Sequence, residues 1–257
     1  MVEHTRAHPR LKQIAPDGRR EKLALGSLFL PAKLQLKSFT PLLIFFHGPT
    51  FVPEVAAAQH GKMAVVSINI GAGSGVYVKA FLDPQNFAAL LREAETKAGV
   101  KFRPITLGGW SAGCGAIRQI MSTPEYYDLI SNTIIIDGIH TGYSAGKPGP
   151  LESQIDPDNL QVFINLARDA MLGKKRVIIT HSEIFPGTFA STTETADYIL
   201  KELGLRRRVI VKWGPKQTQE LSEVRAGRFL LIGFAGNSAP DHVDQLHSLP
   251  EYLKWLK

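Results

Sequence analysis

Short apolar runs that alternate with segments of helical periodicity constrain the fold of this chain most strongly. Two of these runs, Pro41–His47 and Met63–Ile70, are nearly continuous in apolar residues, as expected of strands buried on both faces of a sheet. The clearest helical segment starts at Pro84, after the capping residue Asp83, and ends at Gly99. Strands that alternate with helices predict an α/β fold, a three-layer sandwich in which a mostly parallel sheet carries helices on both faces.

The same patterns predict the other elements. Strands are expected at Leu23–Leu30, Leu34–Lys37, Pro104–Gly108, Asn132–Asp137, Arg176–Thr180, Val209–Trp213 and Phe229–Phe234. Helices are expected at Asp158–Leu172, at Ser191–Gly204 and at Val243–Leu256. The second of these helices opens with a capping box, Ser191 to Glu194. The sequence leaves open which of the two last strands is the final parallel one.

Composition excludes several classes of protein. With 44% hydrophobic and 21% charged residues, the chain can bury a core and is not a disordered polymer. A single cysteine, Cys114, excludes an internal disulfide framework and a cysteine-based zinc cluster. No apolar stretch approaches the eighteen residues or so of a membrane span. We therefore expect a soluble chain, either cytoplasmic or exported with its leader removed.

The domain organisation follows from what separates the elements. The sequence contains no internal repeat, no low-complexity segment and no Ser- or Gly-rich linker. We therefore expect one domain over residues 1–257. Its first twenty residues, Met1–Arg20, are polar and basic, lack the apolar core of a signal peptide, and are expected to be a loosely ordered N-terminal segment.

The charge balance is moderately basic. Lysine and arginine number 30 against 23 acidic residues, for a net charge of +7. The basic residues are scattered in short clusters (Arg19–Arg20, Lys174–Lys175 and Arg206–Arg208) without the interleaved aromatics of a nucleic-acid platform. We interpret them as solvated helix ends and loops, and expect no nucleic-acid partner.

The strongest chemical signal is the segment Gly109-Trp110-Ser111-Ala112-Gly113. It lies between an apolar strand and a helix-forming run, so Ser111 falls on a tight strand-to-helix turn. Such a turn needs small residues two before and two after the serine, to avoid collision with the turn itself. The helix that follows directs the positive end of its dipole at a developing oxyanion. This context favours a nucleophilic serine over an ordinary serine in a Gly-rich turn.

On these residues, on Phe45-Phe46-His47-Gly48 and on a histidine near the C-terminus, the chain resembles the α/β-hydrolase superfamily. The resemblance extends over most of residues 35–257 in element order, and it names no substrate. It implies an oxyanion hole formed by the backbone N–H of Ala112 and by the loop after His47. Pro49 occupies the usual donor position and has no N–H, so Thr50 or Gly48 must serve. We interpret His47 itself as a structural anchor of that loop.

The resemblance also implies the chain order serine, acid, histidine. Of the eight histidines, His242 and His247 follow the last strand. His242 is expected in a loop just before the final helix, from which it can reach a serine on a neighbouring turn. His247 is expected at a polar surface position within the helix. We therefore choose His242 as the base.

Two carboxylates are candidates for the acid. Asp137 ends the apolar run Ile134–Ile136, where a carboxylate is costly unless it is paired, and an imidazole N–H is a suitable partner. Glu183 follows the later strand, where the superfamily more often keeps its acid. We favour Asp137 and keep Glu183 as the alternative.

Three other features have simpler interpretations. Gly71–Gly75 lacks the third glycine of a dinucleotide fingerprint, which would fall at Val76, so we expect a flexible loop there. Cys114 is expected to be a buried packing residue. A loop that begins at His140 and Tyr143 is expected at the surface, with His140 as a possible binding residue.

Together these residues predict a serine hydrolase that cleaves a carboxylic ester through an acyl-enzyme, without a metal or organic cofactor. A peptidase or an acyltransferase would use the same triad, and a non-catalytic binding module could use the same fold. The expected partner is a small-molecule or polymer-linked ester. The sequence leaves open the acyl and alcohol groups, the oligomeric state and the compartment.

Overall fold

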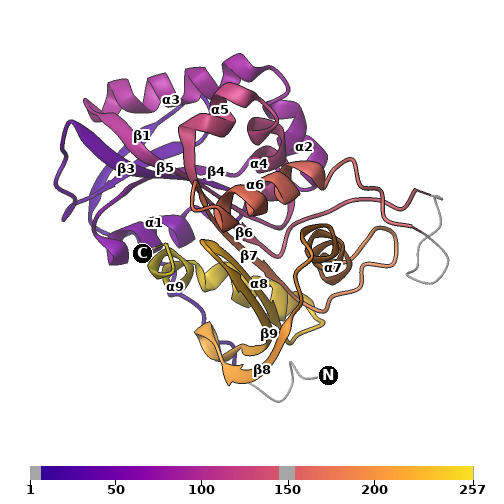
Figure 1. Cartoon of the computed structure of the whole chain (residues 1–257). Helices are drawn as coiled ribbons and strands as arrows, with labels where there is room; N and C mark the ends of the chain where they lie inside the picture. Colours follow the sequence, from indigo (N-terminus) through magenta and orange to yellow (C-terminus); the bar gives the residue numbers. More distant parts are fainter. Residues whose placement is uncertain (1–6, 145–153, 257) are drawn as a thin grey trace. The chain divides into compact units, whose positions relative to one another are not determined.

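The computed structural model describes residues 7–144 and 154–256 (Figure 1). The internal contacts of the chain define two compact units, and the single domain expected from the sequence stays a prediction. We call Leu11–Ile134 with Leu249–Lys257 the first unit, and Met1–Arg10 with Ile135–Ser248 the second unit.

The first unit is built on a sheet whose inner strands are parallel. Its strands are β1 (Gly18–Lys22), β2 (Ser27–Pro31), β3 (Phe39–Phe46), β4 (Ala64–Ile68) and β5 (Lys101–Trp110). They lie in the order β1-β2-β4-β3-β5. Strand β3 pairs in parallel with both β4 and β5, whereas β2 is antiparallel to β1 and to β4. The chain passes into the second unit within β6 (Ile130–Ile136).

Helices cover both faces of these strands. They are α1 (Phe51–His60), α2 (Ser74–Ala80), α3 (Pro84–Ala98), α4 (Cys114–Met121), α5 (Pro124–Leu129) and α9 (Leu249–Lys254). Figure 1 shows α3, α4 and α5 on one face and α1 with α9 on the other. The predicted ends of α3 are confirmed: the Asp83 carboxylate accepts from the Gln85 N–H, and Gly99 closes the helix in the left-handed conformation.

The second unit has the strands β7 (Arg176–His181), β8 (Arg208–Trp213), β9 (Gln219–Ala226) and β10 (Phe229–Phe234), in the order β7-β10-β9-β8. Strand β10 is parallel to β7 and antiparallel to β9, and β8 is antiparallel to β9. The final parallel strand is therefore β10, which settles the choice that the sequence left open.

Helices also lie on both faces of the second unit. They are α6 (Gln161–Met171), α7 (Thr192–Leu203) and α8 (Ala239–His247). Successive residues of β7 show the arrangement: the Thr180 hydroxyl bonds to Gln245 of α8, and the His181 ring to Thr193 of α7. Because neighbouring side chains of a strand point to opposite faces, α7 and α8 cover opposite faces of β7. The predicted α/β class, central parallel strands between helices, is confirmed.

Several predicted elements are wrong in detail. Residues Leu34–Lys37 form no strand, and the expected strand Leu23–Leu30 is interrupted by a turn in which the Leu23 N–H bonds to the Gly26 carbonyl. Gly26 has φ 88°, and a Cβ there would lie 2.3 Å from the Ser67 carbonyl oxygen, so the turn requires glycine. Helix α2 begins at Ser74, within the expected flexible loop. The predictions omit α1, α2, α5, β1 and β9.

The expected final helix is two helices. Helix α8 begins at Ala239 and ends at His247, and α9 begins at Leu249. Pro250 has no N–H to continue the ladder of α8, but it fits the first turn of a new helix. None of the helices in residues 7–144 and 154–256 is long and apolar enough to cross a bilayer.

Strand β3 provides a test of the core. Phe45 is 1% exposed, whereas Phe39 of the same strand is 62% exposed. We expect Phe45→Ala to lower the free energy of unfolding by about 3–5 kcal/mol, because the truncation leaves a cavity, and Phe39→Ala to change it by less than about 0.5 kcal/mol. Urea titration followed by circular dichroism measures both. Equal losses in the two variants would contradict the buried position of Phe45.

Candidate active site

Ser111 lies at the turn between β5 and α4. Its φ is 49°, a conformation rare for a side-chain-bearing residue, and a short 3₁₀ turn (η2, Ser111–Gly113) leads into α4. Gly113 is required sterically, and Gly109 has little room for a side chain. A Cβ at Gly113 would lie 2.1 Å from the Phe46 carbonyl oxygen, and one at Gly109 would lie 3.1 Å from the Gly113 carbonyl carbon. The spacing of the motif is therefore explained by close backbone packing around Ser111.

Two further residues at strand ends have the same unusual backbone. His47 follows β3 with φ 71°, and Asp137 follows β6 with φ 44°. Ligand and catalytic residues of α/β sheets lie beyond the carboxyl ends of the strands, and such conformations persist where the surrounding structure enforces them, often at functional sites. Three sequence-predicted residues thus share one local signature.

The Tyr77 side chain contacts His47, the first residue of the loop after β3. The His47 Nδ1 lies 2.9 Å from the Tyr77 hydroxyl, which also bonds to Asn69, and the His47 ring stacks on Trp110 at 5.1 Å between centroids. These contacts agree with the structural role predicted for His47. Burial raises the pKa of Tyr77 more than its backbone hydrogen bonds lower it, so Tyr77 stays neutral.

The predicted oxyanion donors lie at the starts of two helices. Gly48 has φ 101°, Thr50 occupies the N-cap position of α1, and Ala112 lies buried in the turn after Ser111. Cys114, at the start of α4, is buried as predicted, with its thiol 3.4 Å from the Gly109 carbonyl oxygen.

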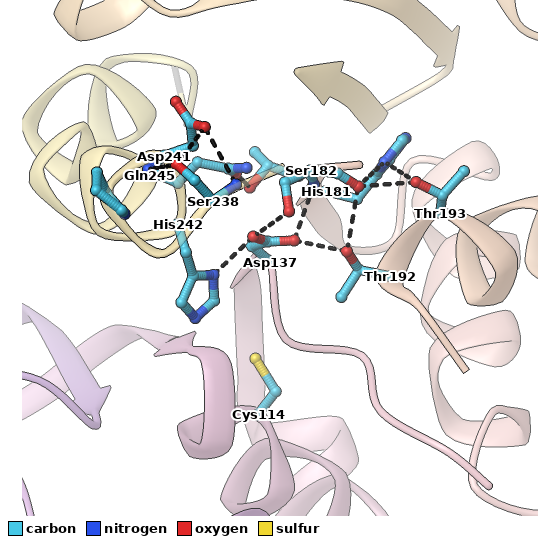
Figure 2. A network of polar contacts seen from close by, with 12 residues as sticks. Cys114, Asp137, His181, Ser182, Thr192, Thr193, Ser238, Asp241, His242 and Gln245 are labelled. Atoms are coloured by element: carbon cyan, nitrogen blue, oxygen red, sulfur yellow. Dashed lines mark hydrogen bonds and ion pairs between the residues drawn. The ribbon is translucent and has the colours of Figure 1, made fainter. Parts of the chain in front are cut away.

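Asp137 is the centre of a polar network in the second unit (Figure 2). Its side chain is almost wholly buried. The Oδ1 atom accepts from the Ser182 N–H at 2.8 Å and from the Thr192 hydroxyl at 2.6 Å. The Oδ2 atom accepts from the Ser182 hydroxyl at 2.7 Å and lies 2.7 Å from the Nδ1 of His242. The four contacts use both oxygens and fix the orientation of the carboxylate.

The same contacts set its ionisation. Burial by itself would raise the pKa of Asp137, but the hydrogen bond and charge of His242, with the hydroxyls of Thr192 and Ser182, outweigh burial and lower the pKa to about 2. Asp137 is therefore a carboxylate at neutral pH, and it orients the His242 ring through Nδ1.

His242 was predicted in a loop, and this prediction is wrong: it lies in the first turns of α8. The helix begins earlier because Ser238 and Asp241 form a capping box with Pro240 in the first turn.

The prediction that His247 lies at the surface is also wrong, since its side chain is buried, with 6% of its surface exposed. Burial, followed by the charge of Arg10, lowers the pKa of His247.

The N-terminal segment anchors α8. Asp244, with no exposed surface, pairs with Arg10 at 2.9 Å and with His8 at 2.5 Å. Residues 7–20 are thus not loosely ordered throughout, although Met1–Arg6 lie outside the described residues. His8, Asp241 and Asp244 also have the spacing of a metal site, but Asp241 caps α8 and Asp244 is ion-paired, so we assign them a structural role.

The structure places His242 beside Asp137 rather than beside Glu183. Glu183 is exposed, and its backbone N–H bonds to the Gly236 carbonyl. Ser111 belongs to the first unit, and the Asp137–His242 pair belongs to the second.

Sequence reasoning missed Ser182 and Thr192 as partners of Asp137. Ser182 directly precedes Glu183, and Thr192 follows the Ser191 cap of α7, but nothing local in the sequence marks their hydroxyls as partners of Asp137. The loop expected to begin at His140 and Tyr143 is less exposed at its start than predicted, because Tyr143 is buried and bonds to Glu194 at 2.9 Å. Residues 145–153 of this loop lie outside the described residues. Burial lowers the pKa of His140 to about 4, so its half-buried ring is neutral at physiological pH.

The chain is similar to known proteins in its structure but not detectably in its sequence. No protein-family model matches the chain, and no curated protein matches its sequence. Among solved structures, acetyl xylan esterase from Aspergillus awamori superposes with a TM-score of 0.51 at 16% identity, over 90% of this chain and 92% of that one. Poly(aspartic acid) hydrolase-1 from Sphingomonas sp. KT-1 gives 0.51 at 12% identity, over 95% and 99%.

The chain has the α/β-hydrolase fold. The turn at Ser111 follows β5, the strand that pairs in parallel with β3. The capped α8, which carries His242, follows the final parallel strand β10. The predicted succession of β5, the turn at Ser111 and α4, and the position of His242 after the last parallel strand, match the observed element order.

The Asp137 network predicts an acid-dependent loss of stability. Because the folded pKa of about 2 is below the ordinary value of 3.8, the ionised carboxylate stabilises the fold above about pH 4, and this contribution disappears as the pH falls through about 2. We expect Asp137→Asn to lower the free energy of unfolding by about 2 kcal/mol at pH 6, and by progressively less toward pH 3.

Urea midpoints measured from pH 6 to pH 3 test this expectation. The matched control is Asp158→Asn, an exposed carboxylate, which should change the free energy of unfolding by less than about 0.5 kcal/mol throughout. A difference between wild type and Asp137→Asn that stays constant over this range contradicts the assigned ionisation.

Proposed function

We propose that the chain is a serine hydrolase that cleaves a carboxylic ester, with Ser111 as nucleophile, His242 as base and Asp137 as acid. The observation that carries the proposal is the contact of 2.7 Å between His242 Nδ1 and the buried Asp137 carboxylate. A histidine whose Nδ1 is held by an ionised carboxylate has its Nε2 as the proton acceptor. The strained turn at Ser111 is the second support, because it presents the hydroxyl beyond the end of β5.

In the first half of the reaction, the Ser111 hydroxyl attacks the carbonyl carbon of the ester while His242 Nε2 takes its proton. The C–O bond to the alcohol then breaks, and His242 returns the proton to the departing alkoxide. The product is an acyl-enzyme and a free alcohol. Asp137 remains ionised throughout, stabilising the imidazolium that forms, as its low pKa requires.

In the second half, water replaces the alcohol. His242 takes a proton from water, the resulting hydroxide attacks the acyl carbonyl carbon, and the proton passes to the Ser111 oxygen as the acid leaves. Each attack on the carbonyl carbon, first by Ser111 and then by hydroxide, gives a tetrahedral intermediate with a negatively charged oxygen. We propose that it is bound by the Ala112 N–H with the N–H of Gly48 or Thr50, since Pro49 has none.

The substrate class is the less defined part of the proposal. One similar structure is named as an acetyl xylan esterase and another as a poly(aspartic acid) hydrolase. At 16% and 12% identity, neither substrate transfers to this chain. Three alternatives to an esterase remain to be tested. They are a peptidase or an acyltransferase that uses the same three residues, and a non-catalytic binding protein.

The central experiment measures hydrolysis of chromogenic esters of increasing acyl length by the full chain. We expect wild type to hydrolyse at least one of them and Ser111→Ala to lose about a thousandfold or more in kcat/KM, because the nucleophile is removed. Ser122→Ala, an exposed serine just after α4, is the matched control and should keep wild-type activity.

Each alternative gives a different result. Full activity of Ser111→Ala would contradict the assignment of the nucleophile. Hydrolysis of aminoacyl anilides in preference to esters would make the protein a peptidase. Transfer of the acyl group to an added alcohol in preference to water would make it an acyltransferase. No turnover of any of these by folded wild type would support the binding protein.

A further inference from the structure

Strand β8 is the last in the strand order of the second unit (Figure 1). It carries an exposed apolar row. Val209, Val211 and Trp213 are 82%, 72% and 73% exposed. The pairing of β8 with β9 shifts register between Val209 and Lys212. Alternate residues of a strand share a face, and we treat the three exposed side chains as one row along β8. Among residues 7–144 and 154–256, β9 is the one strand paired with β8. The other backbone edge of β8 is therefore open within that range.

The charged residues of β8 do not protect this edge in the usual way. Arg208 pairs with Glu223, and Lys212 lies 3.0 Å from Glu220. Both glutamates belong to β9, and their side chains are 4% exposed. Exposed edge strands are commonly blunted by unpaired cations that repel a second strand. Here each cation is already neutralised within the chain, on the face opposite the apolar row.

We propose that β8 pairs in antiparallel fashion with β8 of a second copy of this chain, around a two-fold axis at Val211. In this register Val211 faces the partner subunit's Val211, and Trp213 faces the partner subunit's Val209. Aromatic and β-branched residues opposite each other are favourable cross-strand pairs. The row of three side chains becomes a row of six on one face of a continuous sheet.

The charges select this register. With the axis at Val211, Lys212 faces the partner subunit's Ile210, and Arg208 faces the partner subunit's Gly214. Moving the axis to Ile210 would place Arg208 against the partner subunit's Lys212, and moving it to Lys212 would place two lysines together. Like charges directly opposite are destabilising. Two-fold axes at residues 210, 211 and 212 each pair most of β8 with its copy. Of these three, only the axis at Val211 avoids placing a lysine or arginine of one subunit directly opposite a lysine or arginine of the other.

The same self-complementarity argues for a second copy rather than a different protein. An isologous interface uses one patch on both subunits, so it closes after two copies and leaves no free edge. The strand itself supplies both halves of every favourable pair. This inference does not depend on the proposed hydrolase activity, because none of its residues is assigned to catalysis.

Sedimentation equilibrium of the full chain tests the inference. Wild type should sediment as a concentration-dependent dimer, and Val211→Lys should raise the dimer dissociation constant about tenfold or more, because it places two cations against each other at the axis. The side chain of Val211 is exposed in the single chain, so the variant should fold. Leu172→Lys, at an equally exposed apolar position (71%) after α6, is the matched control and should leave the constant unchanged.

Cross-linking tests the register. In Val211→Cys, the introduced thiols of two subunits should be joined by a short bismaleimide, whereas Leu172→Cys should give no cross-linked dimer. A wild type that is monomeric at about 100 µM would overturn the proposal, as would a dimer unaffected by Val211→Lys. Association only with a different protein, with no self-association, would also overturn it.

Discussion

The second unit is organised by the need to satisfy one buried carboxylate. Asp137 lies at the end of β6 with 1% of its surface exposed, where an ionised side chain is costly unless hydrogen bonds and an opposite charge compensate. Its partners come from the end of β7, the start of α7 and the first turns of α8. One residue thereby fixes the positions of three elements that lie far apart in sequence, including the helix that carries His242.

In the first unit, the unfavourable feature is a strained backbone conformation and not a buried charge. Ser111 occupies a left-handed conformation that costs free energy. Its neighbours are packed so closely that any side chain at Gly113 would collide with β3. The paired inner strands β3 and β5 flank the turn, and one of the strained residues is the serine whose hydroxyl is proposed to react.

Local signals were the predictable part of this structure. The turn at Ser111, the ends of α3 and the capping box of α7 depend on residues a few positions apart, and all three lie where the sequence placed them. Contacts between distant segments were not predictable in the same way. Ser182 and Thr192 become partners of Asp137 only when β7 and α7 meet it in space. The start of α8 was locally encoded by Ser238 and Pro240, but the apolar periodicity from Val243 onward concealed it.

The account depends most on the claim that His242 activates Ser111. Treatment of the full chain with a fluorophosphonate, followed by mass spectrometry of the modified peptide, measures this directly. The account predicts modification at Ser111 that slows about a thousandfold in folded His242→Asn and keeps its rate in folded His247→Asn, from the same helix. Modification of a different serine, or an unchanged rate in His242→Asn, would contradict it.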